Sequence, residues 1–157
     1  MENILISACL LGVQCRYDGE SKPIMSSVAL MERCHLIPIC PEQLGGLPTP
    51  REPSERQGEA VVSKTGADVT NAFARGAEQA LHLAKLYGCT AAVLKERSPS
   101  CGSGEIYDGT FSSRLTAGDG VTAALLKANG VAVYGESEID ALLARLCPPG
   151  DTQPSFF

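Results

Sequence analysis

The sequence predicts an α/β protein: a single-domain, three-layer (αβα) Rossmann-like fold with a mostly parallel sheet. Three observations support this prediction. A length of 157 residues suits one domain that buries a sizeable core without disulfides. Short apolar runs alternate with segments of helical periodicity, as in proteins built from β-α-β units. The apolar runs have no polar face, which is typical of parallel strands covered by helices on both sides.

The N-terminal part contains two expected strands with a helix between them. Residues 4–8 form a short apolar run that ends at Cys9 in a Leu-Leu-Gly turn. Residues 25–33 have helical spacing, with apolar side chains on or near one face. A second apolar run at 35–39 is followed by Cys40 and a proline, which stop it.

The middle of the chain combines broken polar sequence with the clearest helix. Residues 44–59 are rich in Gly, Pro, Arg and Glu, so we expect a loop there, followed by a short strand or edge at residues 61–62. Asp68 is a good N-cap, and Gly88 is a good stop for a helix over 68–87. The apolar residues of this helix recur at a 3.6-residue period.

The C-terminal part continues the alternation. We expect a buried strand at 89–94, a Gly-rich loop at 97–109 and a helix that begins near residue 119. A strand at 131–134 and a last helix, capped by Ser137 and ending near Leu146, complete the fold. We therefore expect a domain over residues 1–147 and a flexible tail over 148–157.

Seven cysteines stand beside two histidines and no tryptophan. The N-terminus has no basic segment or cleavage site of a signal peptide, and no apolar stretch is long enough to span a membrane. We therefore expect a cytoplasmic protein, in which disulfides are rare, and an odd count cannot form a closed disulfide framework. The cysteines are then metal ligands, a nucleophile or small core residues.

Three of these cysteines follow predicted strands. Cys9 ends the first strand, Cys40 ends the second, and Cys101 lies in the loop after a third. The carboxyl ends of parallel strands meet at one edge of a sheet, where such folds bind ligands. The sequence therefore predicts that these three thiols meet there.

Each of the three cysteines lies in a segment with Gly or Pro and polar residues close by. The segments run from Ser7 to Gly12 with Cys15 to Gly19 beyond, from Cys40 to Arg51, and from Lys95 through Ser98, Ser100 and Gly102. Thiolates are ligands of zinc and of iron–sulfur clusters. Without a CxxC or Cys/His pair, a zinc ribbon is a poor match, whereas three thiolates with no fourth partner suit a cluster with one open iron.

These segments resemble those of the bacterial domain-of-unknown-function family 523 (DUF523), which is associated with thiouracil desulfurases. The resemblance covers about residues 3–135. It implies a [4Fe-4S] cluster held by three cysteines, which fall on Cys9, Cys40 and Cys101, with one open iron. Cys15 is a reserve ligand.

The reaction implied by the resemblance removes sulfur from 2-thiouracil, or a related thiolated pyrimidine, and gives uracil and hydrogen sulfide without net redox. The open iron binds the soft thiocarbonyl sulfur and makes sulfide a better leaving group, and water attacks the carbon. Glu42 is the expected general acid/base. Ser98 and Ser100 are expected to orient the base or the edge of the substrate ring.

The remaining chemistry-bearing residues have plainer interpretations. Cys34, Cys89 and Cys147 lie at helix or strand ends and are expected core or incidental thiols. Four charged residues stay open between pairing with one another, shaping the pocket and contacting the substrate: Arg16, Asp18, Arg51 and Lys95. The histidines His35 and His82 are expected to be structural.

The expected partners are a small-molecule thiolated pyrimidine and the iron–sulfur assembly machinery. A net charge of −5 argues against a general nucleic-acid binder, and no membrane partner is expected. Two alternatives stay open. One is a non-catalytic iron–sulfur or zinc module, such as an electron carrier or sensor, in which Cys15 is a fourth ligand. The other is a thiol-redox or sulfur-transfer enzyme with Cys101 as nucleophile.

Overall fold

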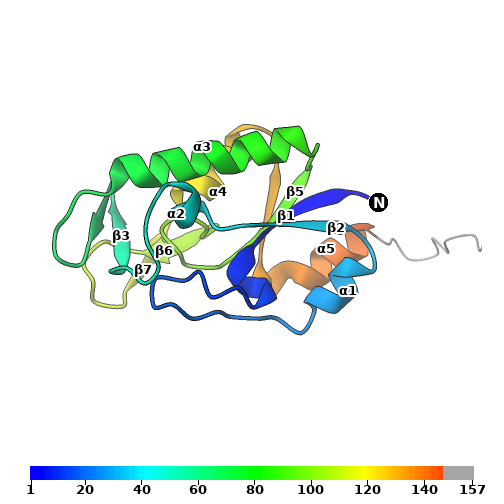
Figure 1. Cartoon of the computed structure of the whole chain (residues 1–157), viewed down its shortest axis with the longest axis horizontal. Coiled ribbons are helices and arrows are strands. Elements are labelled where there is room, and N and C mark those ends of the chain that lie inside the picture. The colour runs from blue at the N-terminus through cyan, green and yellow to red at the C-terminus, as the bar shows by residue number, and fades with distance from the viewer. Residues whose placement is uncertain (147–157) are drawn as a thin grey trace, which may run out of the picture.

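A four-stranded sheet lies at the centre of the protein, and all of its strands run parallel (Figure 1). The computed structural model describes residues 1–146. In spatial order β2-β1-β5-β8, the strands are His35–Ile39, Asn3–Ser7, Ala91–Leu94 and Ala132–Gly135. They correspond to the four apolar runs predicted to form the parallel sheet, so the expected fold class is confirmed.

Helices cover both faces of this sheet, which makes three layers (Figure 1). Helices α3 (Thr70–Leu86) and α4 (Val121–Ala128) lie on one face, and α1 (Ser27–Met31) and α5 (Ile139–Leu146) lie on the other. Two 3₁₀ helices, η1 (Ala8–Leu11) and η2 (Glu136–Glu138), follow β1 and β8 directly.

The central strand β1 contributes to a hydrophobic core on each face. Ile4 and Ile6 pack with residues of α1 and α5, whereas Leu5 packs with residues of α3 and α4. This division follows from the geometry of a strand, in which successive side chains point to opposite faces. All three side chains are fully buried, as expected for a strand without a polar face.

Two antiparallel hairpins lie beside the sheet and were not predicted as such. One joins β3 (Ser54–Gln57) to β4 (Ala60–Ser63), and the other joins β6 (Glu105–Tyr107) to β7 (Leu115–Ala117). The expected loop at 44–59 is therefore wrong in its last part, and the expected Gly-rich loop at 97–109 contains β6. The polar sequence of β3 gives no apolar run, and every residue of β7 is exposed, so neither strand has the burial pattern of the strands of the sheet. The expected strand or edge at 61–62 is confirmed by β4.

The starts of two helices also differ from expectation. Helix α3 begins at Thr70 rather than at Asp68, whose carboxylate accepts the N–H of Thr70 at 2.9 Å. Ser137 does not cap the last helix: its hydroxyl donates to Oε2 of Glu96, because a turn of 3₁₀ helix precedes α5. Gly88, expected to stop α3, has a left-handed backbone with φ of 64°.

A short helix, α2 (Pro41–Leu44), crosses α3 at very close range. A Cβ atom at Gly45 would overlap the carbonyl oxygen of Ala72, and one at Gly76 would overlap that of Pro41. The two glycines therefore let the backbones touch. This contact fixes α2 against α3, and with it Cys40 and Glu42 at the start of α2.

The residues from Cys147 onward, including the tail expected over 148–157, lie outside the described residues. Among residues 1–146, no helix combines the length and apolar character needed to cross a membrane.

Candidate active site

Four cysteines line one pocket at the carboxyl ends of β1, β2 and β5. Cys9 lies in η1 directly after β1, Cys40 lies between β2 and α2, and Cys101 lies in the loop after β5. Cys15, from the loop after η1, joins them. The structure thus brings together the three thiols expected to meet, and adds the reserve thiol to them.

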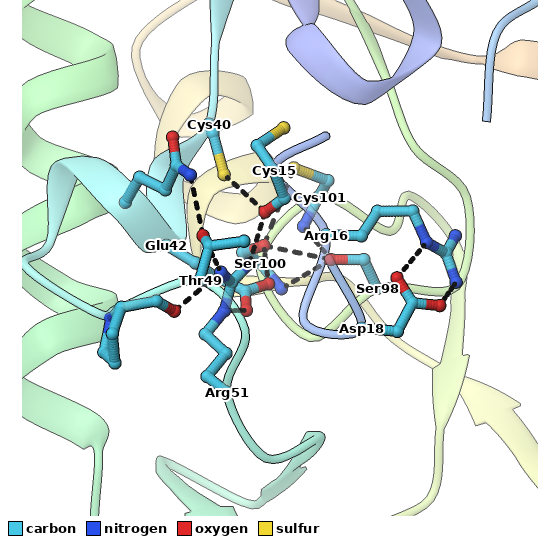
Figure 2. Close-up of polar contacts among 12 residues, drawn as sticks. Cys15, Arg16, Asp18, Cys40, Glu42, Thr49, Arg51, Ser98, Ser100 and Cys101 are labelled. Carbon is cyan, nitrogen blue, oxygen red and sulfur yellow. Dashed lines mark hydrogen bonds and ion pairs between the residues drawn. The ribbon is translucent and has the colours of Figure 1, made fainter. Parts of the chain in front are cut away.

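The positions of these thiols are fixed by local contacts (Figure 2). The Cys40 thiol donates to the carbonyl oxygen of Cys15 at a distance of 3.6 Å. The Cys101 sulfur accepts a hydrogen bond from the hydroxyl of Ser7 at 3.4 Å, and the hydroxyl oxygen of Ser100 lies 3.6 Å from it. The site is therefore assembled from side chains up to 94 residues apart in the chain.

The proximity of these thiols affects their ionisation. Burial, and next the neighbouring thiols, raises the pKa of Cys9 from 9.0 to about 12. The same two causes raise the pKa of Cys15 to about 12, and burial raises that of Cys101 to about 11. The thiols of Cys9, Cys15 and Cys101 therefore keep their protons at neutral pH, although Lys95 and Arg51 act in the opposite direction on Cys9 and Cys15. A metal centre would reverse this, because metal coordination deprotonates thiols.

Glu42 lies in the same pocket, on the first turn of α2. Its Oε1 accepts a hydrogen bond from Nε of Arg51, and its Oε2 accepts one from the Ser100 hydroxyl, both at 2.9 Å (Figure 2). The two contacts fix the orientation of the carboxylate. A carboxylate held beside a ligand pocket is suited to taking up and returning a proton.

Ser98 and Ser100 form a directed chain of hydrogen bonds that ends at Glu42. Oγ of Ser98 accepts the N–H groups of Ser100 and Cys101 at 3.1 and 3.0 Å. Its own hydroxyl is then free to donate to Oγ of Ser100, 2.9 Å away, and Ser100 donates onward to Glu42. The three residues expected to carry the acid/base chemistry therefore form one connected group.

Arg51 has a larger part in the site than the sequence indicates. Besides Glu42, it donates to the carbonyl oxygen of Cys15 at 2.9 Å through a second nitrogen. Its side chain is only 7% exposed. Arg51 therefore links the carboxylate to the loop that carries Cys15. Its partner could not be identified from sequence because the path of the chain between residues 44 and 54 was unknown.

Ser7 was also missed as a site residue. It is a buried polar residue at the end of the apolar strand β1. Its hydroxyl donates to the Cys101 sulfur and accepts the backbone N–H of Lys95 at 2.9 Å. A serine ending a run of buried apolar residues was the available signal, because buried hydroxyls need partners.

The structure gives ion-pair partners to the remaining charged candidates and locates Cys34, Cys89 and both histidines outside the pocket. Arg16 pairs with Asp18 at 3.3 Å, and Lys95 pairs with Glu136 at 2.9 Å. Cys34 and Cys89 are buried in the hydrophobic cores on opposite faces of the sheet. His35 and His82 are exposed and do not line the pocket.

The pocket has a volume of about 550 Å³, within the range of small-molecule sites. Its lining contains more basic than acidic side chains although the whole chain carries −5. The basic lining residues are Arg16, Lys22, Arg51, Lys64, Lys95 and Arg97; the acidic ones are Glu42, Glu55 and Glu96. The pocket is therefore suited to a group of net negative charge.

These features fit the cofactor that the resemblance implies. In residues 1–146, no three His, Cys, Asp or Glu side chains are grouped as they would be around a single metal ion. The thiolate ligands of a [4Fe-4S] cluster instead bind different irons, so they surround a larger volume. The donors are soft sulfurs, the pocket is roomy, and its basic lining suits a cluster that thiolates make anionic.

Comparison with known proteins gives consistent results. The sequence profile of the 2-thiouracil desulfurase family matches residues 4–138. The uncharacterized protein YbbK of Bacillus subtilis (strain 168) is 43% identical over 150 residues, which are 89% of this chain and 99% of YbbK. The solved structure of the [4Fe-4S]-dependent thiouracil desulfidase TudS is 51% identical, with a TM-score of 0.90 over 93% of this chain and 98% of TudS.

These likenesses confirm the resemblance on which the sequence analysis relied, the three-layer fold and the expectation of a desulfurase enzyme. The profile spans both the sheet and all four pocket cysteines. The chain belongs to the 2-thiouracil desulfurase family.

Proposed function

We propose that this protein removes sulfur from 2-thiouracil, or a related thiolated pyrimidine, at a [4Fe-4S] cluster. The reaction is a hydrolysis in which water replaces sulfur on the ring carbon, giving uracil and hydrogen sulfide, and no electron is gained or lost. The observation that carries the proposal is the position of Glu42: an oriented carboxylate lies in one pocket with four thiols.

In this proposal Cys9, Cys40 and Cys101 hold the cluster, which leaves one iron without a protein ligand. The three thiols follow three different strands of the sheet and line the pocket together. When bound, the cluster supplies a Lewis-acidic iron that polarises the carbon–sulfur bond through the soft sulfur. The iron–sulfur assembly machinery of the cell is the expected source of the cluster.

The chain's own residues then handle water and protons. Glu42 takes a proton from the attacking water, and Arg51 holds its carboxylate in place. Ser100 holds the second carboxylate oxygen of Glu42, and Ser98 in turn holds the hydroxyl of Ser100. The proton taken up by Glu42 later returns to the sulfide that leaves.

Iron content and sulfide release together test this proposal. Protein purified anaerobically should be brown, contain about four irons per chain and release sulfide and uracil from 2-thiouracil. Thiolated nucleosides assayed in parallel would show whether the pocket also accepts a base with a sugar attached. A colourless, iron-free protein after anaerobic reconstitution would refute the proposal.

Single cysteine variants test the ligand set. Cys9→Ser, Cys40→Ser and Cys101→Ser should each lose the cluster, measured by iron content and visible absorbance. The matched control is Cys89→Ser, since Cys89 is buried in the hydrophobic core away from the pocket lining and should keep the cluster. A cluster retained in the Cys40 variant would show that Cys15 is a ligand in its place.

A further inference from the structure

Aromatic side chains gather on the pocket although the chain contains few of them. The sequence has four tyrosines, four phenylalanines and no tryptophan. Three of these residues, Tyr17, Tyr107 and Phe111, line the pocket. The reaction steps given above to the thiols and the acid/base residues do not involve these aromatic side chains. They form its apolar surface together with a few aliphatic and proline side chains.

Phe111 has an unusual backbone. It lies in the β6–β7 loop with φ of 55°, and Ser113 in the same loop has φ of 62°. The left-handed region is unfavourable for a bulky residue, because Cβ comes too close to the following carbonyl oxygen. Such strain persists only where the surrounding structure enforces it, and it is common at ligand-binding sites.

Polar contacts from β3 enforce this conformation. Oε1 of Glu55 accepts the N–H of Gly109 at 2.9 Å and the N–H of Phe111 at 3.1 Å. The Gln57 amide donates to the carbonyl oxygen of Gly109 at 2.9 Å. A backbone hydrogen bond from Asp108 to Arg114 closes the loop. Phe111 is thus held on the pocket by carboxylate and amide groups of another hairpin.

We propose that Phe111 is a substrate-binding residue that stacks its ring on one face of the pyrimidine. This proposal rests on the proposed function, which supplies a planar heteroaromatic substrate. Water activated by Glu42 must reach the ring carbon from one face of the ring, so an apolar partner can cover the opposite face. An aromatic side chain suits that position, and stacking tolerates differences in ring substituents.

Steady-state kinetics of the cluster-loaded enzyme separate stacking from a structural role. Phe111→Ala should raise KM for 2-thiouracil and the inhibition constant of uracil by the same factor, roughly 5- to 150-fold for one stacked base. In Phe111→Ala the kcat value and the cluster absorbance should stay near wild type. Phe111→Tyr keeps an aromatic ring, so its KM and its inhibition constant for uracil should both stay near wild type. Unchanged constants in Phe111→Ala, or a lost cluster, would overturn the proposal.

A fluorescence titration tests the contact independently of turnover. Because the chain has no tryptophan, Phe111→Trp places a single reporter at the pocket. Uracil should quench it saturably, with a dissociation constant near its inhibition constant. The control is Tyr87→Trp, at an exposed position at the end of α3, whose fluorescence should not respond.

The two arms also distinguish failure of this inference from failure of the proposed function. An enzyme without activity on 2-thiouracil, whose Phe111→Trp variant is still quenched by uracil, would refute the reaction and leave the stacking contact standing. An active enzyme whose Phe111→Trp variant is not quenched, up to the solubility limit of uracil, would refute the stacking contact alone.

Discussion

At the scale of single residues, Glu42 is held by two neighbours that act differently on it. Arg51 brings a permanent positive charge and a fixed donor, whereas Ser100 brings a neutral hydroxyl that can pass a proton on. A carboxamide at this position keeps the size of the side chain but cannot take up a proton. Replacing the carboxylate by a carboxamide need not alter the positions of the cysteine thiols.

Glu42→Gln should therefore lose turnover while the cluster stays bound. We expect kcat to fall by roughly 10²- to 10⁴-fold, the usual contribution of general acid–base catalysis. Sulfide release gives the rate, and visible absorbance gives the cluster content. Glu78→Gln on the exposed side of α3 is the matched control and should be as active as wild type. Full activity in Glu42→Gln would remove this residue from the mechanism.

At the scale of elements, the contact between α2 and α3 links the fold to the site. Helix α2 is short, and its first turn carries Glu42 while Cys40 directly precedes it. A helix of this length is not stable by itself, so its position depends on tertiary contacts. Gly45 and Gly76 supply the closest of these contacts.

Gly76→Ala should impair the site indirectly, because Gly76 lies on α3 where this helix touches α2. Alanine is favoured over glycine inside a helix by about 1 kcal/mol, but here its Cβ would overlap the Pro41 carbonyl. Overpacking typically costs about 1–3 kcal/mol, so we expect a lower Tm together with reduced cluster content. Gln79→Ala, on the exposed face of the same helix, should change the free energy of unfolding by less than about 0.5 kcal/mol. A Gly76→Ala protein with wild-type Tm and iron content would show that α2 adjusts without consequence.

The elements also show how far sequence reasoning reached. The strands β1 and β5 were predictable because burial on both faces leaves a continuous apolar run, and the edge strands β2 and β8 were predictable because they are short, mostly apolar runs. β3 and β7 were not, since β3 is the polar segment Ser-Glu-Arg-Gln and every residue of β7 is exposed. The placement of the thiols followed from the rule that the carboxyl ends of parallel strands meet at one edge of a sheet. The partners of Arg51 and Ser7 did not follow from it. Those contacts depend on how loops far apart in sequence meet.

At the scale of the whole molecule, the thiols make stability depend on pH. The folded, cluster-free chain holds the protons of Cys9, Cys15 and Cys101 more tightly than the unfolded chain, because their pKa values are raised from 9.0 to about 11–12. The stabilisation is complete below pH 9 and is lost as the pH rises through the folded pKa values.

The Tm of the cluster-free protein should therefore fall as the pH rises from about 9 to about 12. In the loaded protein the ligand sulfurs are already deprotonated, so unfolding takes up protons below pH 9 and the Tm should rise with pH toward that value. Differential scanning calorimetry of both forms under argon measures the two slopes. Parallel slopes in the two forms would show that the pocket thiols are not the groups responsible.

The central place of β1 also affects when a cluster can be received during synthesis. Ile4 pairs with Ala91, so β1 acquires its second neighbour only after more than half of the chain has been made. The thiols of Cys9, Cys15 and Cys40 leave the ribosome well before Cys101. A nascent chain therefore exposes three thiols that have no complete binding site. Under the proposed function, a cluster can be inserted only once Cys101 has emerged, and until then the unfinished pocket is open to oxidants and to stray metal ions.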